Sequence, residues 1–257
     1  MQPRDIVFDV NKKIKNTIQL QNRHIPSMEF ISPLNKKINK KLIVMIRGHI
    51  RDAFKDTLLL QLIKNLSQTY DISLYLHTWS ILQSDKSWRK IDKDDTLVTR
   101  QMVEDYFNPI PIKQLIIENE ESISLLGNTE GKISKTLCPI LCWKNMWYGM
   151  NQIIQTIGEP TETTILNIRY DIFTNRNTLF TIQSIQKLIE QNFNKYLYSN
   201  VFISNEPKIG IDNMIIGSLH SMRKLITHFY LNLDEILTRY PEEKHQEYIV
   251  FKENKLV

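Results

Sequence analysis

The pattern of residues 41–79 restricts the fold of this 257-residue chain more than any other feature. Residues 42–46, LIVMI, are a run of apolar side chains, and residues 71–79, DISLYLHTW, are rich in β-branched and aromatic ones, so both predict strands. Between them, residues 52–68 show a helical repeat of apolar side chains, with Asp52 as the expected N-cap. The repeat is carried by Phe54, Leu58, Leu62 and Leu66. A strand, a helix and a strand in so short a stretch predict a right-handed βαβ unit and a parallel sheet.

The remaining chain continues this alternation. Further strands are predicted at residues 113–120, 163–173 and 200–204, and a short turn-and-strand unit at 210–218. Further helices are predicted at residues 98–107, 142–158, 181–193 and 221–240, the last as one helix or a helix pair. Polar loops are predicted at residues 80–100 and 121–136. We therefore expect an α/β fold with a mostly parallel central sheet flanked by helices, formed by a single domain of residues 41–257.

Residues 1–40 are predicted to form a basic N-terminal arm. They contain three prolines, show no sustained period, and carry lysine runs that contribute to a net charge of +5 and a pI of about 9.0. A solvated arm is the favoured interpretation, and contact with an anionic membrane surface is the alternative. We expect no nucleic-acid partner, because the lysine runs lack interleaved aromatic residues and no recognition motif accompanies them.

The apolar segments and the cysteines further restrict the class of protein to which this chain can belong. No apolar stretch approaches the roughly 20 residues of a membrane-spanning helix, and the first residues lack the layout of a secretory signal. The two cysteines, Cys138 and Cys142, exclude a disulfide framework, and two sulfurs alone do not form a zinc site. These features predict a protein of the reducing cytoplasm.

Polar clusters follow the predicted strands. RGHIR (47–51) follows the first strand, HTW (77–79) ends the second, RYD (169–171) ends the fourth, and GIDN (210–213) follows the fifth. In an open α/β sheet, ligands bind outside the carboxyl ends of the strands. The topology therefore predicts that these clusters meet at one edge and form a site.

The first cluster is suited to an anion. Any one of Arg47, His49 and Arg51 alone could face solvent around a turn. Together they match a phosphate, because arginine binds phosphate oxygens bidentately and Gly48 lets backbone donors approach closely. The cluster is neither a GxxxxGK[ST] loop nor a GxGxxG fingerprint.

Other residues of these segments have two interpretations each. His77 is either a core histidine bonded to a neighbouring backbone group or part of the site, and Trp79 either packs in the core or stacks on a base or sugar. In the helix at 142–158, three polar side chains are candidates for lining a polar pocket: Lys144, Asn145 and Tyr148.

Two aspartates are the candidate reactive carboxylates. Asp171 follows an apolar strand and shares a strand face with Arg169, so the two form either a structural pair or a site in which Asp171 binds a metal or sugar hydroxyls. Asp212 lies in a predicted tight turn marked by Gly210 and Asn213.

The ordered motifs resemble a group of bacterial polysaccharide and lipopolysaccharide glycosyltransferases with a GT-A-like fold and few characterised members. Their pattern is GHxR after a strand, hTW after the next, RxD, then DxxxxG with a nearby methionine, and a late PE. The matching segments here are RGHIR (47–51), HTW (77–79), RYD (169–171), DNMIIG (212–217) with Met222, and PEE (241–243). Each motif is short, and their order and spacing over residues 41–251 carry the resemblance.

The resemblance implies a Rossmann-type GT-A sandwich and a cytoplasmic enzyme, peripheral to the inner membrane in one interpretation. It implies transfer of a sugar from a nucleotide-sugar donor to a glycan or lipid-linked acceptor of capsule, O-antigen or lipooligosaccharide. The implied donor-binding residues are Arg47, Gly48, His49, Arg51, His77, Trp79, Lys144 and Arg169. If transfer is inverting, the implied catalytic base is Asp212 first and Asp171 second.

The resemblance also bears on the metal. Most GT-A enzymes hold Mg or Mn with a DxD motif, whereas this chain reads Arg169-Tyr170-Asp171, so no DxD is present. Asp171 is the candidate metal ligand if a metal binds. Metal independence is the alternative, because arginines can supply the positive charge that a leaving diphosphate needs.

Two other functions remain open at this point. One is transfer of a phospho-sugar or phosphoramidate group onto the same glycans, which would use the same basic edge. The other is a non-catalytic glycan-binding or scaffold protein of this fold. A panel of nucleotides and their sugars distinguishes these functions by binding and by product mass.

Overall fold

The computed structural model describes most of the domain predicted from the sequence. The described residues are 40–87, 91–174, 180–193, 201–202 and 213–256. The predicted basic arm, apart from Lys40, and the candidate base Asp212 lie outside these residues.

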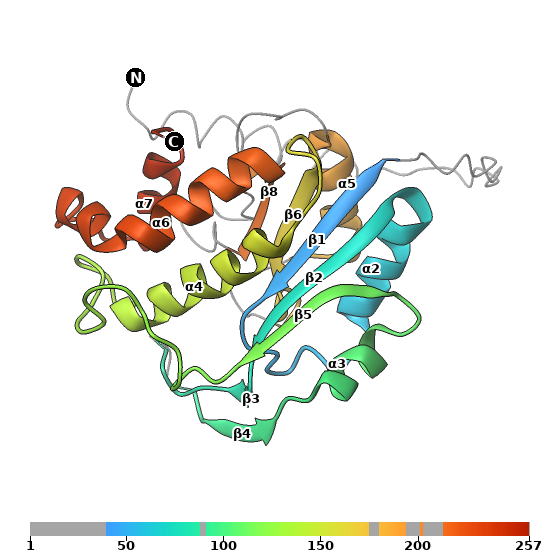
Figure 1. Cartoon of the computed structure of the whole chain (residues 1–257), viewed down its shortest axis with the longest axis horizontal. Helices are drawn as coiled ribbons and strands as arrows, with labels where there is room; N and C mark the ends of the chain where they lie inside the picture. The colour runs from blue at the N-terminus through green and yellow to red at the C-terminus, as the bar shows by residue number, and fades with distance from the viewer. Residues whose placement is uncertain (1–39, 88–90, 175–179, 194–200, 203–212, 257) are drawn as a thin grey trace, which may run out of the picture.

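Within the described residues, a six-stranded sheet has the order β5-β2-β1-β6-β8-β7 (Figure 1). Its strands are β1 (Lys41–Arg47), β2 (Asp71–Trp79), β5 (Ile112–Glu118), β6 (Thr164–Arg169), β7 (Val201–Phe202) and β8 (Met214–Ser218). The first four strands of that order are parallel, while β8 is antiparallel to both β6 and β7. The prediction of an α/β fold with a mostly parallel sheet is confirmed.

Helices cover both faces of the sheet. On one face lie α2 (Leu58–Thr69), α3 (Arg100–Phe107) and α5 (Ile182–Asn192). On the other face lie α4 (Ile140–Thr156), α6 (Leu219–Arg239) and α7 (Gln246–Glu253). Alternate residues of β1 enter the two cores, which is why residues 42–46 form a continuous apolar run.

The strand order reverses between β1 and β6. The chain moves outward from β1 to β2 and β5 through α2 and α3, then crosses to the other face through α4 and returns to β6 beside β1. In doubly wound sheets, the crevice at such a reversal is the usual ligand site. Arg47 and Arg169 are register partners at the carboxyl ends of these two strands.

Two local predictions are wrong. The helix predicted from residue 52 begins at Leu58, whose backbone N–H donates to Asp56 Oδ1 at 2.8 Å, while Asp52 forms an ion pair with Lys55 at 2.7 Å. Phe54 therefore lies before the helix and packs on an α3 aromatic ring. The predicted loop at 80–100 contains an antiparallel strand pair, formed by β3 (Ile81–Gln83) and β4 (Asp94–Leu97).

Other local predictions hold. The last long helix, α6, has a non-helical residue at Asn232, as expected for a helix pair. Cys138 and Cys142 are both free thiols. Among the described helices, none combines the length and apolar character needed to cross a bilayer.

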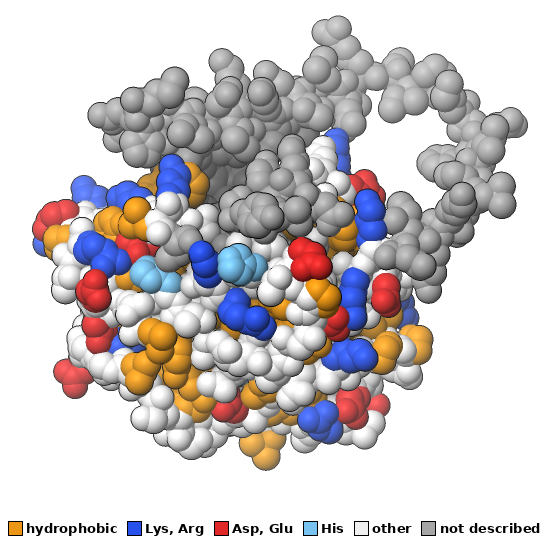
Figure 2. Space-filling view, turned by 45° about the horizontal axis from the view of Figure 1, so that its top comes forward, with side chains coloured by type: hydrophobic (Ala, Val, Ile, Leu, Met, Phe, Trp, Pro, Cys, Tyr) orange, Lys and Arg blue, Asp and Glu red, His pale blue; other side chains and the backbone are white. Residues whose placement is uncertain are grey.

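On the face drawn in Figure 2, basic and acidic side chains are interspersed, which is typical of solvated surface.

Candidate functional site

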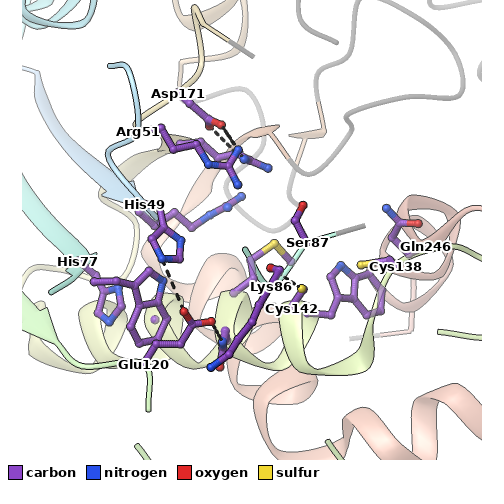
Figure 3. A pocket seen from close by; sticks show the side chains of 18 residues that line it. His49, Arg51, His77, Lys86, Ser87, Glu120, Cys138, Cys142, Asp171 and Gln246 are labelled. Carbon is purple, nitrogen blue, oxygen red and sulfur yellow. Dashed lines mark hydrogen bonds and ion pairs between the residues drawn. The ribbon is translucent and has the colours of Figure 1, made fainter. Parts of the chain in front are cut away.

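A cavity of about 140 Å³ lies at the carboxyl ends of the parallel strands, at the reversal between β1 and β6 (Figure 3). Besides Asn145, eight residues singled out as site candidates in the sequence line it. They are Arg47, Gly48, His49, Arg51, His77, Trp79, Arg169 and Asp171. Segments that are far apart in the chain therefore meet at one edge of the sheet, as the topology predicted.

Asp171 holds two arginines in place. Its carboxylate accepts hydrogen bonds from Arg169 Nε at 2.7 Å and Nη2 at 2.8 Å, and from Arg51 Nη1 at 2.7 Å. The Asp171 side chain is only 4% exposed. The structural pair considered in the sequence analysis is therefore present, and it extends to a second guanidinium. We infer from this geometry that Asp171 positions the side chains of Arg51 and Arg169.

Arg47 and Gly48 line the cavity at the end of β1. The Arg47 side chain is buried, and its Nε donates to Asn167 Oδ1 at 3.1 Å. Gly48 follows with φ of +94°, a conformation that favours glycine, and a Cβ there would meet no atom within 4 Å. The backbone conformation, and not lack of space, therefore requires glycine at this turn.

His49 is a largely buried histidine that lies close to two arginines. Burial, followed by the nearby Arg51 and Arg169 charges, lowers the pKa of His49 to about 3. Its ring is therefore neutral at pH 7, so the contact of Nε2 with Glu120 Oε2 at 3.7 Å is not an ion pair. Among the charged side chains that line the cavity, four are basic and two are acidic.

His77 is a buried histidine with a carboxylate partner. Its Nε2 lies 3.0 Å from Glu118 Oε2, and its ring packs edge-on against Trp79 with centroids 4.8 Å apart. His77 is buried, as in the core interpretation, but it also lines the cavity, and its partner is a side chain and not a backbone group. Tyr148 donates to the other Glu118 oxygen at 2.9 Å. Hydrogen bonding by His77 holds the pKa of Glu118 below its usual range.

The sequence analysis missed the acidic side of the cavity. Glu120, just beyond β5, lines the cavity with its side chain 8% exposed and accepts a hydrogen bond from Asn145 Nδ2. The signal was present, because the predicted strand 113–120 ends in a polar tail like the other strands. Lys86 and Trp143 also line the cavity and were not predicted.

Lys144 does not line the cavity, so the structure does not bring it together with the other predicted donor-binding residues. Its ammonium forms an ion pair with Asp234 Oδ1 at 2.7 Å and donates to the carbonyl of Leu126. It thereby ties α4 to α6 and to the preceding loop. The neighbouring Asn145, named with it as a pocket candidate, does line the cavity.

The described residues do not fit a metal held by the protein. They contain no group of three or more His, Cys, Asp and Glu side chains suited to a metal ion. Asp171, the candidate ligand, already accepts three hydrogen bonds from guanidinium groups. We therefore derive no step through a metal.

Neither a comparison with models of known protein families nor one with curated proteins finds a match for this chain. The fold and the cavity together define an α/β protein with a cavity, lined by more basic than acidic side chains, at the reversal of its sheet.

Proposed function

We propose that this protein is a glycosyltransferase with a GT-A-like fold, which moves a sugar from a nucleotide-sugar donor to a bacterial surface glycan. The observation that carries the proposal is the placement of Arg47, Arg51 and Arg169 on one cavity at the reversal between β1 and β6. Such a crevice is where doubly wound folds bind nucleotides. The acceptor is a capsular, O-antigen or lipooligosaccharide glycan, free or lipid-linked, and the enzyme works at the cytoplasmic side of the inner membrane.

The arginines suit the charge that develops during transfer. The acceptor hydroxyl oxygen bonds to the anomeric carbon, and the bond from that carbon to the diphosphate oxygen breaks. The electron pair stays on the diphosphate, and the hydroxyl proton passes to a base. Fixed guanidinium groups aimed at the leaving oxygens stabilise this charge without reorganisation. Asp171 and Asn167 preorganise those groups through the hydrogen bonds described above.

The catalytic base that accepts the hydroxyl proton is proposed separately from the donor-binding residues. Asp212 is the candidate if transfer is inverting, and its position lies outside the described residues. Asp171 is not proposed as the base, because both of its oxygens accept hydrogen bonds from arginines. We expect Asp212→Asn to retain donor affinity and to lose turnover, and full retained turnover would remove Asp212 from this role.

Calorimetry with a nucleotide panel tests the proposal. We expect one of UDP, GDP or CDP to bind more tightly than its nucleoside, and Arg47→Gln and Arg169→Gln each to weaken diphosphate binding by about tenfold or more while changing nucleoside binding little. Arg100→Gln is the matched control, because Arg100 is exposed and pairs with Glu104 on α3. No binding of any diphosphate, or equal losses for both ligands, would contradict the proposal.

A further inference from the structure

The cavity has two chemically different ends. Arg47, Arg51 and Arg169 form the guanidinium end, at the carboxyl ends of β1 and β6. Glu120 and Asn145 form the carboxylate end, supplied by the segment after β5 and by α4. His49 lies between the two ends in Figure 3, with its Nε2 directed toward Glu120. The neutral His49 ring therefore separates the cationic part of the cavity from its acidic part.

The carboxylate end contains a buried polar atom that has no partner among the described residues. Asn145 Oδ1 makes no hydrogen bond to any described residue, although Asn145 is 5% exposed. The indole N–H of Trp143, which is 3% exposed and lines the same cavity, also lacks a partner among these residues. A buried polar atom left unpaired is costly, so groups of this kind usually have a water or ligand partner.

The acceptors at this end determine which ligand groups fit. The Asn145 Oδ1 and Glu120 oxygens accept hydrogen bonds, so they match hydroxyl or amino groups. A phosphate or carboxylate on the ligand would instead meet the buried Glu120 with a like charge. Lys86 is the nearby cation, and its ammonium lies 3.9 Å from Glu121 on the partly exposed side.

We propose that the carboxylate end binds the sugar to be transferred, and that this sugar is uncharged or bears an amino group. Glu120 selects against uronic acids and phospho-sugars, while the guanidinium end holds the donor diphosphate. This inference rests on the proposed glycosyltransferase function and deepens it. It also favours sugar transfer over the transfer of a phospho-sugar or phosphoramidate group.

The test compares matched donors that differ only in sugar charge. After the nucleotide panel has identified the base, affinities are measured by calorimetry for UDP-glucose against UDP-glucuronate, or GDP-mannose against GDP-mannuronate. We expect the wild-type protein to favour the neutral member by about tenfold or more. Glu120→Gln should remove most of this preference by strengthening uronate binding, because it removes the like charge and keeps a similar shape.

Glu121→Gln is the control, since it makes the same charge change one residue away at an exposed side chain that does not line the cavity. Equal wild-type affinity for both donors, with tight diphosphate binding, would overturn this inference and leave the proposed function standing. An equal loss of preference in Glu120→Gln and Glu121→Gln would also overturn it. Absence of diphosphate binding would overturn the proposed function itself. The affinities of the wild-type protein for the neutral donor and the uronate donor test this inference even if Glu120→Gln does not fold.

Discussion

Replacing Asp171 by asparagine should destabilise the protein by leaving two guanidinium groups close together without their shared carboxylate. Asp171 is 4% exposed, and Arg51 and Arg169 are 20% and 22% exposed. Removing one partner of a buried ion pair costs about 3–5 kcal/mol, and exposed pairs cost about 0–1 kcal/mol. Because water partly screens the two arginines, we expect Asp171→Asn to lower the free energy of unfolding by about 2–3 kcal/mol.

Urea denaturation at pH 7 measures this loss. Asp95→Asn is the matched control, because Asp95 forms an ion pair with Lys93 in which both side chains are largely exposed. We expect the control to change the free energy of unfolding by less than about 1 kcal/mol. A double variant tests the role of charge more directly than the single one. Adding Arg51→Gln to Asp171→Asn should restore part of the stability, since it removes one of the two like charges that shared the carboxylate.

Two results would refute the reasoning about Asp171. One is a loss no larger than that of Asp95→Asn, which would mean that the carboxylate does not hold the guanidinium groups. The other is a double variant less stable than Asp171→Asn, which would mean that Arg51 contributes mainly through packing and not through charge.

Three further outcomes follow from the site and from the buried acid of α7. Binding of pyrophosphate should raise the pKa of His49 from about 3, followed by NMR of its ring, because an anion offsets the arginine charges; an unchanged pKa would place the anion elsewhere. Burial raises the pKa of Glu253, but hydrogen bonds from Arg239 and His228 outweigh burial and hold this pKa below its usual range. The stability that the Glu253 carboxylate contributes is therefore present above the unfolded-state pKa and is lost as the pH falls through the folded-state pKa. Glu253→Gln should therefore flatten the acid side of a stability profile, and an unchanged profile would contradict this. EDTA should change diphosphate affinity by less than about threefold if the guanidinium groups supply the charge, whereas a loss restored by Mn²⁺ would contradict this.

The layered fold and the meeting of strand ends were predictable because both depend on local patterns and a chirality rule. The apolar run at residues 42–46 requires burial on both faces, and right-handed crossovers bring successive strand ends to one edge. The antiparallel direction of β8 was not predictable, since a buried strand has the same apolar pattern in either direction. The start of α2 was missed because Asp52 and Asp56 are equally good local acceptors by sequence.

The site residues differ in how far sequence could place them. Arg47 and Arg169 end strands, so their location follows from topology alone. Lys144 lies on a helix, where its direction depends on a tertiary partner, Asp234, that is distant in sequence. Glu120 lies beyond the end of a strand, and only the path of the following segment turns its side chain into the cavity.

Gly149 should not tolerate alanine, although alanine is the better helix former by about 1 kcal/mol. A Cβ at this position of α4 would lie 2.7 Å from His77 Nδ1 and 2.8 Å from Cε1. The His77 ring is 1% exposed, is bonded to Glu118 and packs against Trp79, so it cannot move without breaking these contacts. Overpacking of this kind costs about 1–3 kcal/mol, and losing a hydrogen bond to a charged group costs about 1.5–3 kcal/mol.

After subtraction of the helix gain, we expect Gly149→Ala to lower the free energy of unfolding by about 1.5–5 kcal/mol in urea denaturation. Gly158→Ala is the control, since a Cβ there meets no atom within 4 Å and its φ lies outside the left-handed region. That variant should be neutral or stabilised by up to about 1 kcal/mol. Because His77 and Trp79 line the cavity, Gly149→Ala should also weaken donor binding, which Gly158→Ala should leave intact. Equal stability of the two variants would show that the His77 ring can move. It would contradict the inference that this ring is a rigid part of the cavity lining.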